Sequence, residues 1–214
     1  MSKEQYIQYG SGFSAPREWR NFDASPTLRF ERLPVIGQLY TKNATRFPDN
    51  VEYGDIVKGL PVAADSCTGV YCSHILEHLS LTDFRIALAN TYNVLQSGGI
   101  FRLVVPDLDY LARQYLNDNT DEAAYTFMRD SYLGIENRPR HLKGLLASWL
   151  GNSQHLWMWD YKSLSQELIK AGFIEVRHAA FGDSVDALFL TVEEQGRWDN
   201  CLGVECKKPL ENAR

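Results

Sequence analysis

The sequence predicts one α/β domain built on a mostly parallel β-sheet with helices on both faces. Three observations lead to this prediction. The chain has 214 residues, which is about the length of a single domain. Short apolar runs recur along it, and several of them end in small or acidic residues. Clear helical patterns lie between some of these runs, and strands that alternate with helices are typical of a parallel sheet.

Seven short runs are predicted to be strands, at residues 6–9, 19–22, 51–53, 69–72, 100–105, 174–181 and 202–206. The fifth run, Ile-Phe-Arg-Leu-Val-Val, is the most strand-like, because it is apolar and β-branched. The last two runs are joined by a loop without a helical pattern, so we expect them to pair antiparallel at one end of the sheet.

Two helices are predicted between these strands. The first lies between the fourth and fifth runs, where apolar residues recur at three- and four-residue spacing and Thr82 is the expected N-cap. The second covers residues 162–171, where Ser163 and Gln166 resemble a capping box.

Residues 107–160 depart from this alternation. They carry helical patterns at 108–116, 122–133 and 142–150 and are rich in Trp, Tyr and His. We therefore expect one domain over residues 1–214, with an inserted helical segment at about 107–160 that binds the acceptor or acts as a lid.

The composition excludes several classes of protein. Apolar residues make up 44% of the chain and charged residues 23%, which is ordinary for a globular protein. The net charge of −5 disfavours a dedicated nucleic-acid-binding protein. No apolar run approaches the roughly 20 residues that span a bilayer, and no signal peptide opens the chain. We expect a soluble, cytoplasmic protein that binds neither nucleic acid nor membrane.

Small, acidic and hydroxyl residues follow the first four predicted strands. In an open parallel sheet, ligands bind beyond the carboxyl ends of the strands, and glycines there let the backbone approach a ligand. An acid after the second strand can accept hydrogen bonds from both ribose hydroxyls, and one after the third can accept from an exocyclic amine. The set fits an adenosine-type cofactor and comprises Gly10, Ser11, Gly12, Asp23, Asp55, Ser73 and His74.

The spacing of this set counts against NAD. Gly10 and Asp23 are thirteen residues apart, whereas the dinucleotide fingerprint has roughly twenty, so little room is left for a full first helix. An NAD-dependent oxidoreductase remains an alternative.

Five segments of the sequence resemble the class I S-adenosylmethionine-dependent methyltransferases, specifically a small type 11-like group often associated with polysaccharide biosynthesis. They are YIQYGSGFSAPREWRNFDASP, VEYGDIVKGLPVAADSCTGVYCSHILEHL, NVLQSGGIFRLVVPDLDYL, HLWMWDYKSLSQELIKAGFIEV and CLGVECKKP. The resemblance implies a Rossmann-like fold with a mostly parallel seven-stranded sheet and one antiparallel strand. It also implies S-adenosyl-L-methionine as cofactor and a saccharide or other small molecule as acceptor.

The resemblance assigns cofactor contacts by position. Gly10, Ser11 and Gly12 would approach the methionine part, Asp23 would hold the ribose, Asp55 and Ile56 would bracket the adenine, and Ser73 and His74 would close the pocket floor. The chain departs from the family pattern in its truncated first helix and in Ala15, which stands at the third glycine position.

The segment His74-Ile75-Leu76-Glu77-His78 offers a different interpretation, because H-x-x-E-H is the inverted zinc-peptidase motif. On a helix, His74 and His78 would share a face with Glu77 nearby. Since His74 directly follows a strand-like run, we expect a strand-to-helix turn and no metal. A zinc-dependent hydrolase using these three residues remains an alternative, as does a turn whose side chains satisfy local backbone groups.

A hydroxyl acceptor would benefit from a general base. The candidates are His155 in the aromatic stretch HLWMWDY, Asp107 after the fifth strand, and His78. Each has an ordinary structural explanation as well: the aromatic rings can pack the inserted segment onto the sheet, and Asp107 can cap a helix from residue 108. A catalytically degenerate methyltransferase fold that only binds a partner is a further alternative.

Overall fold

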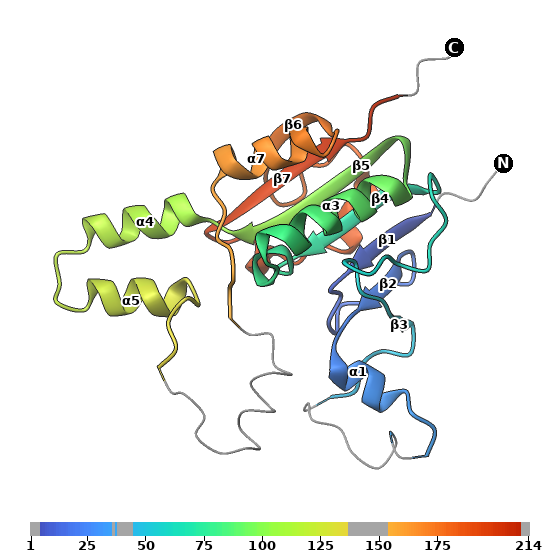
Figure 1. Ribbon diagram of the computed structural model, residues 1–214, viewed down its shortest axis with the longest axis horizontal. Helices are drawn as coiled ribbons and strands as arrows, with labels where there is room; N and C mark the ends of the chain where they lie inside the picture. The colour runs from blue at the N-terminus through green and yellow to red at the C-terminus, as the bar shows by residue number, and fades with distance from the viewer. Residues whose placement is uncertain (1–4, 36, 38–44, 137–153, 211–214) are drawn as a thin grey trace.

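A seven-stranded β-sheet organises the molecule (Figure 1). The computed structural model describes residues 5–35, 37, 45–136 and 154–210. The strands lie in the order β3-β2-β1-β4-β5-β7-β6. Their bounds are β1 (Tyr6–Tyr9), β2 (Arg20–Asp23), β3 (Val51–Tyr53), β4 (Cys67–Ser73), β5 (Leu95–Pro106), β6 (Ile174–Ala179) and β7 (Cys201–Lys207).

One strand runs against the others. Strands β3, β2, β1, β4 and β5 pair in parallel, and β7 is antiparallel to both β5 and β6. The central strands β1 and β4 are mostly apolar and almost completely buried, as is typical of parallel strands covered on both faces. These pairings confirm the predicted seven-stranded, mostly parallel sheet with one antiparallel strand.

Helices α3 (Leu81–Val94) and α7 (Tyr161–Lys170) cover one face of the sheet (Figure 1). Their apolar sides join the largest core cluster. Both predicted N-caps are wrong by a few residues. The cap of α3 is Ser80, which accepts from Asp83 N, and the cap of α7 is Asp160, which forms the capping box with Ser163. Several hydroxyl and acidic residues precede each helix, so the sequence alone does not show which one caps it.

Over β1, β4 and β5 the opposite face is covered by short 3-10 helices, η2 (Ala187–Thr191) and η3 (Gln195–Arg197), and by aromatic side chains. Trp19 packs edge-on against Tyr6 and Phe189, with ring centroids 5.3 Å apart in both pairs. The link between β1 and β2 contains only turns and no α-helix, which agrees with the truncated first helix expected from the sequence.

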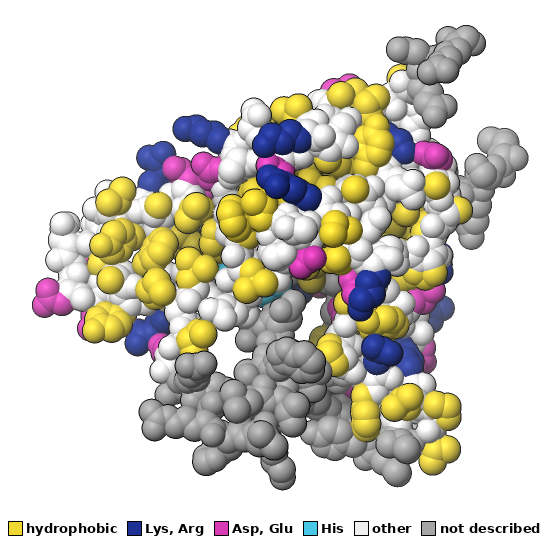
Figure 2. All heavy atoms as spheres, in the orientation of Figure 1, with side chains coloured by type: hydrophobic (Ala, Val, Ile, Leu, Met, Phe, Trp, Pro, Cys, Tyr) yellow, Lys and Arg dark blue, Asp and Glu magenta, His cyan; other side chains and the backbone are white. Residues whose placement is uncertain are grey.

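Helix α1 (Pro26–Glu31) follows β2, and a short 3-10 helix, η1 (Leu76–His78), follows β4. Helices α4 (Leu108–Asn117) and α5 (Ala123–Asp130) follow β5 and project from the sheet as a hairpin (Figure 1). The predicted helix at 142–150 lies outside the described residues. Figure 2 shows apolar side chains gathered over this hairpin. The exposed apolar residues of α4 and α5 include Tyr115, Leu116 and Tyr125. In the described part of the chain, no helix is both long and apolar enough to cross a membrane.

A buried arginine ties the sheet to the segment that covers its second face. Arg102 lies in β5 and is fully buried. Its guanidinium donates to Glu193, to Glu205 at 3.0 Å and to Asp183 at 2.9 Å, and it stacks over the Trp198 ring at 4.5 Å. Three carboxylates surround the cation, so the group satisfies its hydrogen bonds without water.

Candidate functional site

The carboxyl ends of four adjacent strands form one edge of the sheet. Strands β3, β2, β1 and β4 are neighbours, so the residues that follow them lie side by side. Backbone bonds join these ends: Ser11 N donates to Phe22 O at 3.0 Å, and Gly54 N donates to Asp23 O at 3.1 Å. The edge therefore gathers the residues after β1, β2 and β3, as the sequence predicts.

Asp23 holds the turn after β1. Its Oδ2 accepts a hydrogen bond from Gly12 N at 2.9 Å, and its Oδ1 accepts from Ser25 N at 2.7 Å. The side chain is buried. A carboxylate has about four acceptor positions, so two remain for a ligand's hydroxyls. Asp23 can thus both order the glycine turn and bind a ribose.

Gly10 and Gly12 both adopt positive φ, at 70° and 54°, which favours glycine. Their surroundings differ. A Cβ at Gly10 would come within 2.0 Å of Ile75 Cγ1, whereas a Cβ at Gly12 would meet nothing within 4 Å. Gly10 therefore allows the close approach of the segment after β4, and Gly12 borders open space.

Buried hydroxyl groups without partners lie among the predicted cofactor residues. Ser11 and Ser73 are buried, and neither Oγ has a hydrogen-bond partner among the described residues. An unpartnered buried hydroxyl is costly unless a ligand or water satisfies it. With the open space beside Gly12, the Ser11 hydroxyl gives this edge the character of a site for a polar ligand, so these residues fit the cofactor that the sequence implies.

The residues after β3 are more engaged in local structure. Asp55 Oδ1 accepts from Val57 N at 3.0 Å, and Oδ2 pairs with Lys58 Nζ at 3.0 Å. Ile56 is buried in the main core cluster. Asp55 keeps free acceptor positions, but the side chain of Ile56 packs inward against the core.

The H-x-x-E-H segment does not form a helix with both histidines on one face. His74 follows β4 in a left-handed turn with φ 55°, and only Leu76–His78 are helical, as the 3-10 helix η1. The expected strand-to-helix turn is confirmed, and the helical zinc-peptidase arrangement is wrong. Contacts of the His74 ring with Arg197 and Glu77 help to hold the residue in this left-handed conformation, which is uncommon for residues other than glycine.

His74 connects this turn to the C-terminal segment. Its Nε2 donates to Arg197 O at 2.9 Å, and its Nδ1 lies 3.4 Å from Glu77 Oε1. Burial opposes protonation of the ring, but the contacts with Cys201, the nearby Glu77 carboxylate and the Arg197 carbonyl outweigh it and raise the pKa of His74 to about 10. The imidazolium form is therefore the main one near neutral pH.

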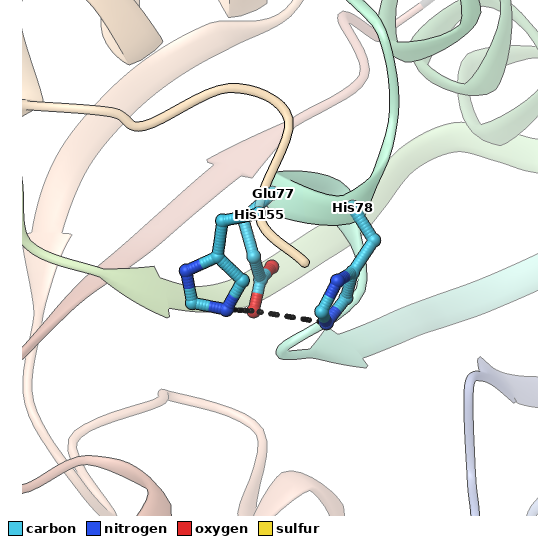
Figure 3. Close-up of side chains that lie close together, drawn as sticks. All are labelled: Glu77, His78 and His155. Atoms are coloured by element: carbon cyan, nitrogen blue, oxygen red, sulfur yellow. Dashed lines mark ion pairs between the residues drawn. The ribbon is translucent and has the colours of Figure 1, made fainter. Parts of the chain in front are cut away.

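Glu77, His78 and His155 form a compact cluster beside this turn (Figure 3). Glu77 Oε1 lies 4.0 Å from His78 Nε2 and 4.0 Å from His155 Nε2. Glu77 is completely buried, and neither of its carboxylate oxygens makes a hydrogen bond to the described residues. Burial, opposed by the Glu77 carboxylate, lowers the pKa of His155, which favours the neutral ring.

Backbone hydrogen bonds bring His155 to the cluster. Leu156 N and Trp157 N both donate to Glu77 O, at 2.8 and 3.1 Å, and His78 Nδ1 bonds Gln154 O at 3.0 Å. His155 is thus fixed beside η1 by contacts that are far apart in the sequence. The sequence marks both pieces, H-x-x-E-H and the aromatic stretch, but does not show that they meet.

Asp107 and one tryptophan of the aromatic stretch have structural roles, whereas another tryptophan of the stretch is exposed. Asp107 caps α4, because its Oδ1 accepts from Asp109 N at 2.9 Å. Trp159 is buried and packs on Phe84, with ring centroids 4.2 Å apart, whereas Trp157 is 41% exposed. One of these two tryptophans completes the core, and the other remains accessible beside the cluster.

Comparisons with known proteins agree with this architecture. Residues 34–103 match a family model described as a methyltransferase domain. No curated protein matches the chain significantly. The chain shares its fold with an S-adenosylmethionine-dependent methyltransferase of Thermotoga maritima, at 15% identity and a TM-score of 0.52 over 97% of this chain and 84% of that one. It is similar in the same way to a Haloferax volcanii methyltransferase solved with the Trm112 activator, at 14% identity and a TM-score of 0.50 over 96% and 83%. Part of the chain is thus similar to a methyltransferase domain, and the chain as a whole shares its fold with S-adenosylmethionine-dependent methyltransferases.

Proposed function

We propose that this enzyme transfers a methyl group from S-adenosyl-L-methionine to a hydroxyl group of a saccharide or another small molecule. The observation that carries the proposal is the joining of the glycine turn to Asp23 at the carboxyl edge of the sheet, in a fold that also places Glu77, His78 and His155 together after β4. The first feature suits the adenosyl cofactor, and the second suits an acceptor that must lose a proton.

Eight residues of the edge are assigned to the cofactor in this proposal. Asp23 would accept from the ribose hydroxyls while it holds the Gly12 amide, and Asp55 would accept from the adenine amine. The Ser11 hydroxyl, which has no partner in the described part of the protein, would bond a polar atom of the methionine part. The whole set is Gly10, Ser11, Gly12, Asp23, Asp55, Ile56, Ser73 and His74.

When bound, S-adenosyl-L-methionine supplies an electrophilic methyl group on its sulfonium. The protein has to align the acceptor oxygen with that methyl group and keep water away, and alignment alone can contribute several kcal/mol. The rigid edge of the sheet and the turn held by Asp23 supply the alignment on the cofactor side.

His155 is the first candidate for the group that takes the proton of the acceptor hydroxyl. Burial keeps its ring neutral, so it can accept a proton near neutral pH. His78 lies beside it, with ring centroids 4.9 Å apart, and is the next candidate. Asp107 is less suited, since its carboxylate already caps α4. The exposed ring of Trp157 could stack on a sugar.

Calorimetric titration with S-adenosylmethionine and S-adenosylhomocysteine tests the cofactor half of the proposal. Asp23→Ala should weaken binding roughly 10- to 150-fold, because a hydrogen bond to a charged group contributes about 1.5–3 kcal/mol. Asp49→Ala is the matched control, since Asp49 is an exposed acid in the turn that precedes β3. Absence of binding to the unmodified protein, or equal affinities for the two variants, would contradict the proposal.

Mass spectrometry of reactions with labelled cofactor tests the acceptor half. A panel of free sugars, sugar nucleotides and small alcohols should include a substrate that gains a methyl ether, and His155→Asn should reduce kcat about 10²- to 10⁴-fold. Methylation confined to amines or thiols would reject the hydroxyl acceptor while leaving the cofactor assignment intact.

A further inference from the structure

The Glu77 carboxylate is in an unusual state for a buried charge. It is inaccessible to solvent, and neither oxygen receives a hydrogen bond from the described residues. Burying an ionised carboxylate costs several kcal/mol unless a cation or several donors compensate for it. On one side the ring of His74 faces it, with Nδ1 3.4 Å from Oε1. The histidines on the other side of the carboxylate require a separate explanation.

The hydrogen bonds of His78 leave a lone pair directed toward Glu77. The Gln154 carbonyl can only accept, so the 3.0 Å contact means that Nδ1 of His78 carries the proton. Nε2 is therefore the ring nitrogen that is left to bind a ligand, and it lies 4.0 Å from the carboxylate oxygen of Glu77. A metal ion between these two atoms could be bound by both of them.

His155 faces the same carboxylate oxygen. Its Nε2 also lies 4.0 Å from Glu77 Oε1, and the residue is buried (Figure 3). One ligand atom from each of the three residues can be chosen so that all lie within 4.8 Å of one another. Two ligands of a tetrahedral ion lie about 3.4 Å apart when each bond is near 2.1 Å, so binding requires the longest of these separations to shorten by up to about 1.4 Å.

We propose that Glu77, His78 and His155 bind one divalent transition-metal ion. Two imidazole nitrogens and one carboxylate oxygen form a ligand set that suits zinc, manganese, iron(II) or cobalt. The Gln154 carbonyl accepts a hydrogen bond from His78 Nδ1, and outer partners of this kind orient the ligands in established metal sites. Three protein ligands leave coordination positions open, as in catalytic sites.

The metal site is independent of the cofactor assignment and changes how the acceptor is activated. With the ion bound, the nitrogens of His78 and His155 are ligands and no longer accept protons. A hydroxyl oxygen coordinated to the ion loses its proton more easily, because the ion stabilises the alkoxide. The proton then leaves to solvent or buffer, and the oxygen attacks the methyl carbon as the methyl–sulfur bond breaks, which releases S-adenosylhomocysteine.

Titration of chelator-treated full-length protein with Mn²⁺ and with Zn²⁺ tests the proposal by calorimetry. We expect one ion per chain and a rise in Tm on binding. Glu77→Gln and His155→Asn should each weaken binding by more than about 100-fold, since loss of an outer partner alone typically costs 10- to 100-fold. His178→Gln is the control, because His178 is exposed and stacks on Tyr161, with ring centroids 3.6 Å apart, away from the cluster.

The outcomes separate clearly. No metal binding by the unmodified protein, or binding that survives Glu77→Gln, would overturn the proposal. If Glu77→Gln fails to fold, His78→Gln replaces it, since His78 is only half-buried. S-Adenosylmethionine titration of the same metal-free protein distinguishes the two proposals: cofactor binding without metal binding rejects the metal site alone, and the reverse rejects the cofactor assignment alone.

Discussion

The two glycines after β1 should respond very differently to the same substitution. Both have positive φ, so Gly10→Ala and Gly12→Ala each place a side chain in a left-handed conformation, at a cost of about 1–2 kcal/mol. Only Gly10 carries a second cost. Its new Cβ would lie 2.0 Å from Cγ1 and 2.1 Å from Cδ1 of Ile75, far inside van der Waals contact.

Ile75 must therefore move when Gly10 becomes alanine. Overpacking of this kind costs about 1–3 kcal/mol, so the total for Gly10→Ala is about 2–5 kcal/mol, against about 1–2 kcal/mol for Gly12→Ala. Equilibrium unfolding in urea measures both values, with the m-value as the check that the two-state comparison holds.

A double substitution isolates the clash. Ile75→Ala removes the atoms that meet the new Cβ most closely, so Gly10→Ala should cost about 1–3 kcal/mol less in that background than in the unmodified protein. The reasoning is refuted if Gly10→Ala is no more destabilising than Gly12→Ala, or if the double substitution shows no coupling energy. Under the proposed function, Gly12→Ala should also weaken S-adenosylmethionine binding, because its Cβ enters the open space.

Three further predictions concern stability. Arg102→Met should destabilise the protein by about 3–5 kcal/mol in urea unfolding, because buried carboxylates lose their cation, whereas Arg113→Met on the surface of α4 should cost less than about 1 kcal/mol. Hydrogen bonds from Arg85 and a neighbouring lysine lower the pKa of Glu167 to about 2, below its unfolded value near 4.3. The ion pairs of Glu167 therefore stabilise the protein fully above pH 4.5, and this contribution disappears as the pH falls toward 2. Thermal melts should show the pH dependence in the unmodified protein and lose it in Glu167→Gln. Trp159→Ala should cost about 3–5 kcal/mol, since the buried ring packs on α3, and a loss below 1 kcal/mol would contradict that placement.

The sequence predicts the sheet well because strand burial leaves a local signal. The runs at 6–9 and 51–53 coincide with β1 and β3, and the antiparallel pairing of the last two strands follows from the loop between them. The helix caps are predicted less well. Ser80 caps α3 instead of Thr82, since neighbouring hydroxyls differ in backbone geometry, which the residue type does not reveal.

In the site, too, contacts that depend on local sequence are predictable, and contacts between distant segments are not. The joining of Gly12 to Asp23 follows from two adjacent parallel strands, so it is predictable from strand ends alone. The meeting of His155 with Glu77 depends on two backbone bonds to the Glu77 carbonyl from a segment after the α4–α5 hairpin. No periodicity or spacing in the sequence encodes such a contact. The sequence therefore predicts the turn at His74 but does not show that His155 joins Glu77 and His78.

The aromatic layer on the second face has a consequence for biosynthesis. Tyr6 and Trp19 pack against Phe189, which is synthesised much later than either of them. A nascent chain that lacks the segment from η2 to β7 exposes these rings, together with the buried Arg102. Chaperone binding should therefore persist until this segment has been synthesised and has packed onto the sheet.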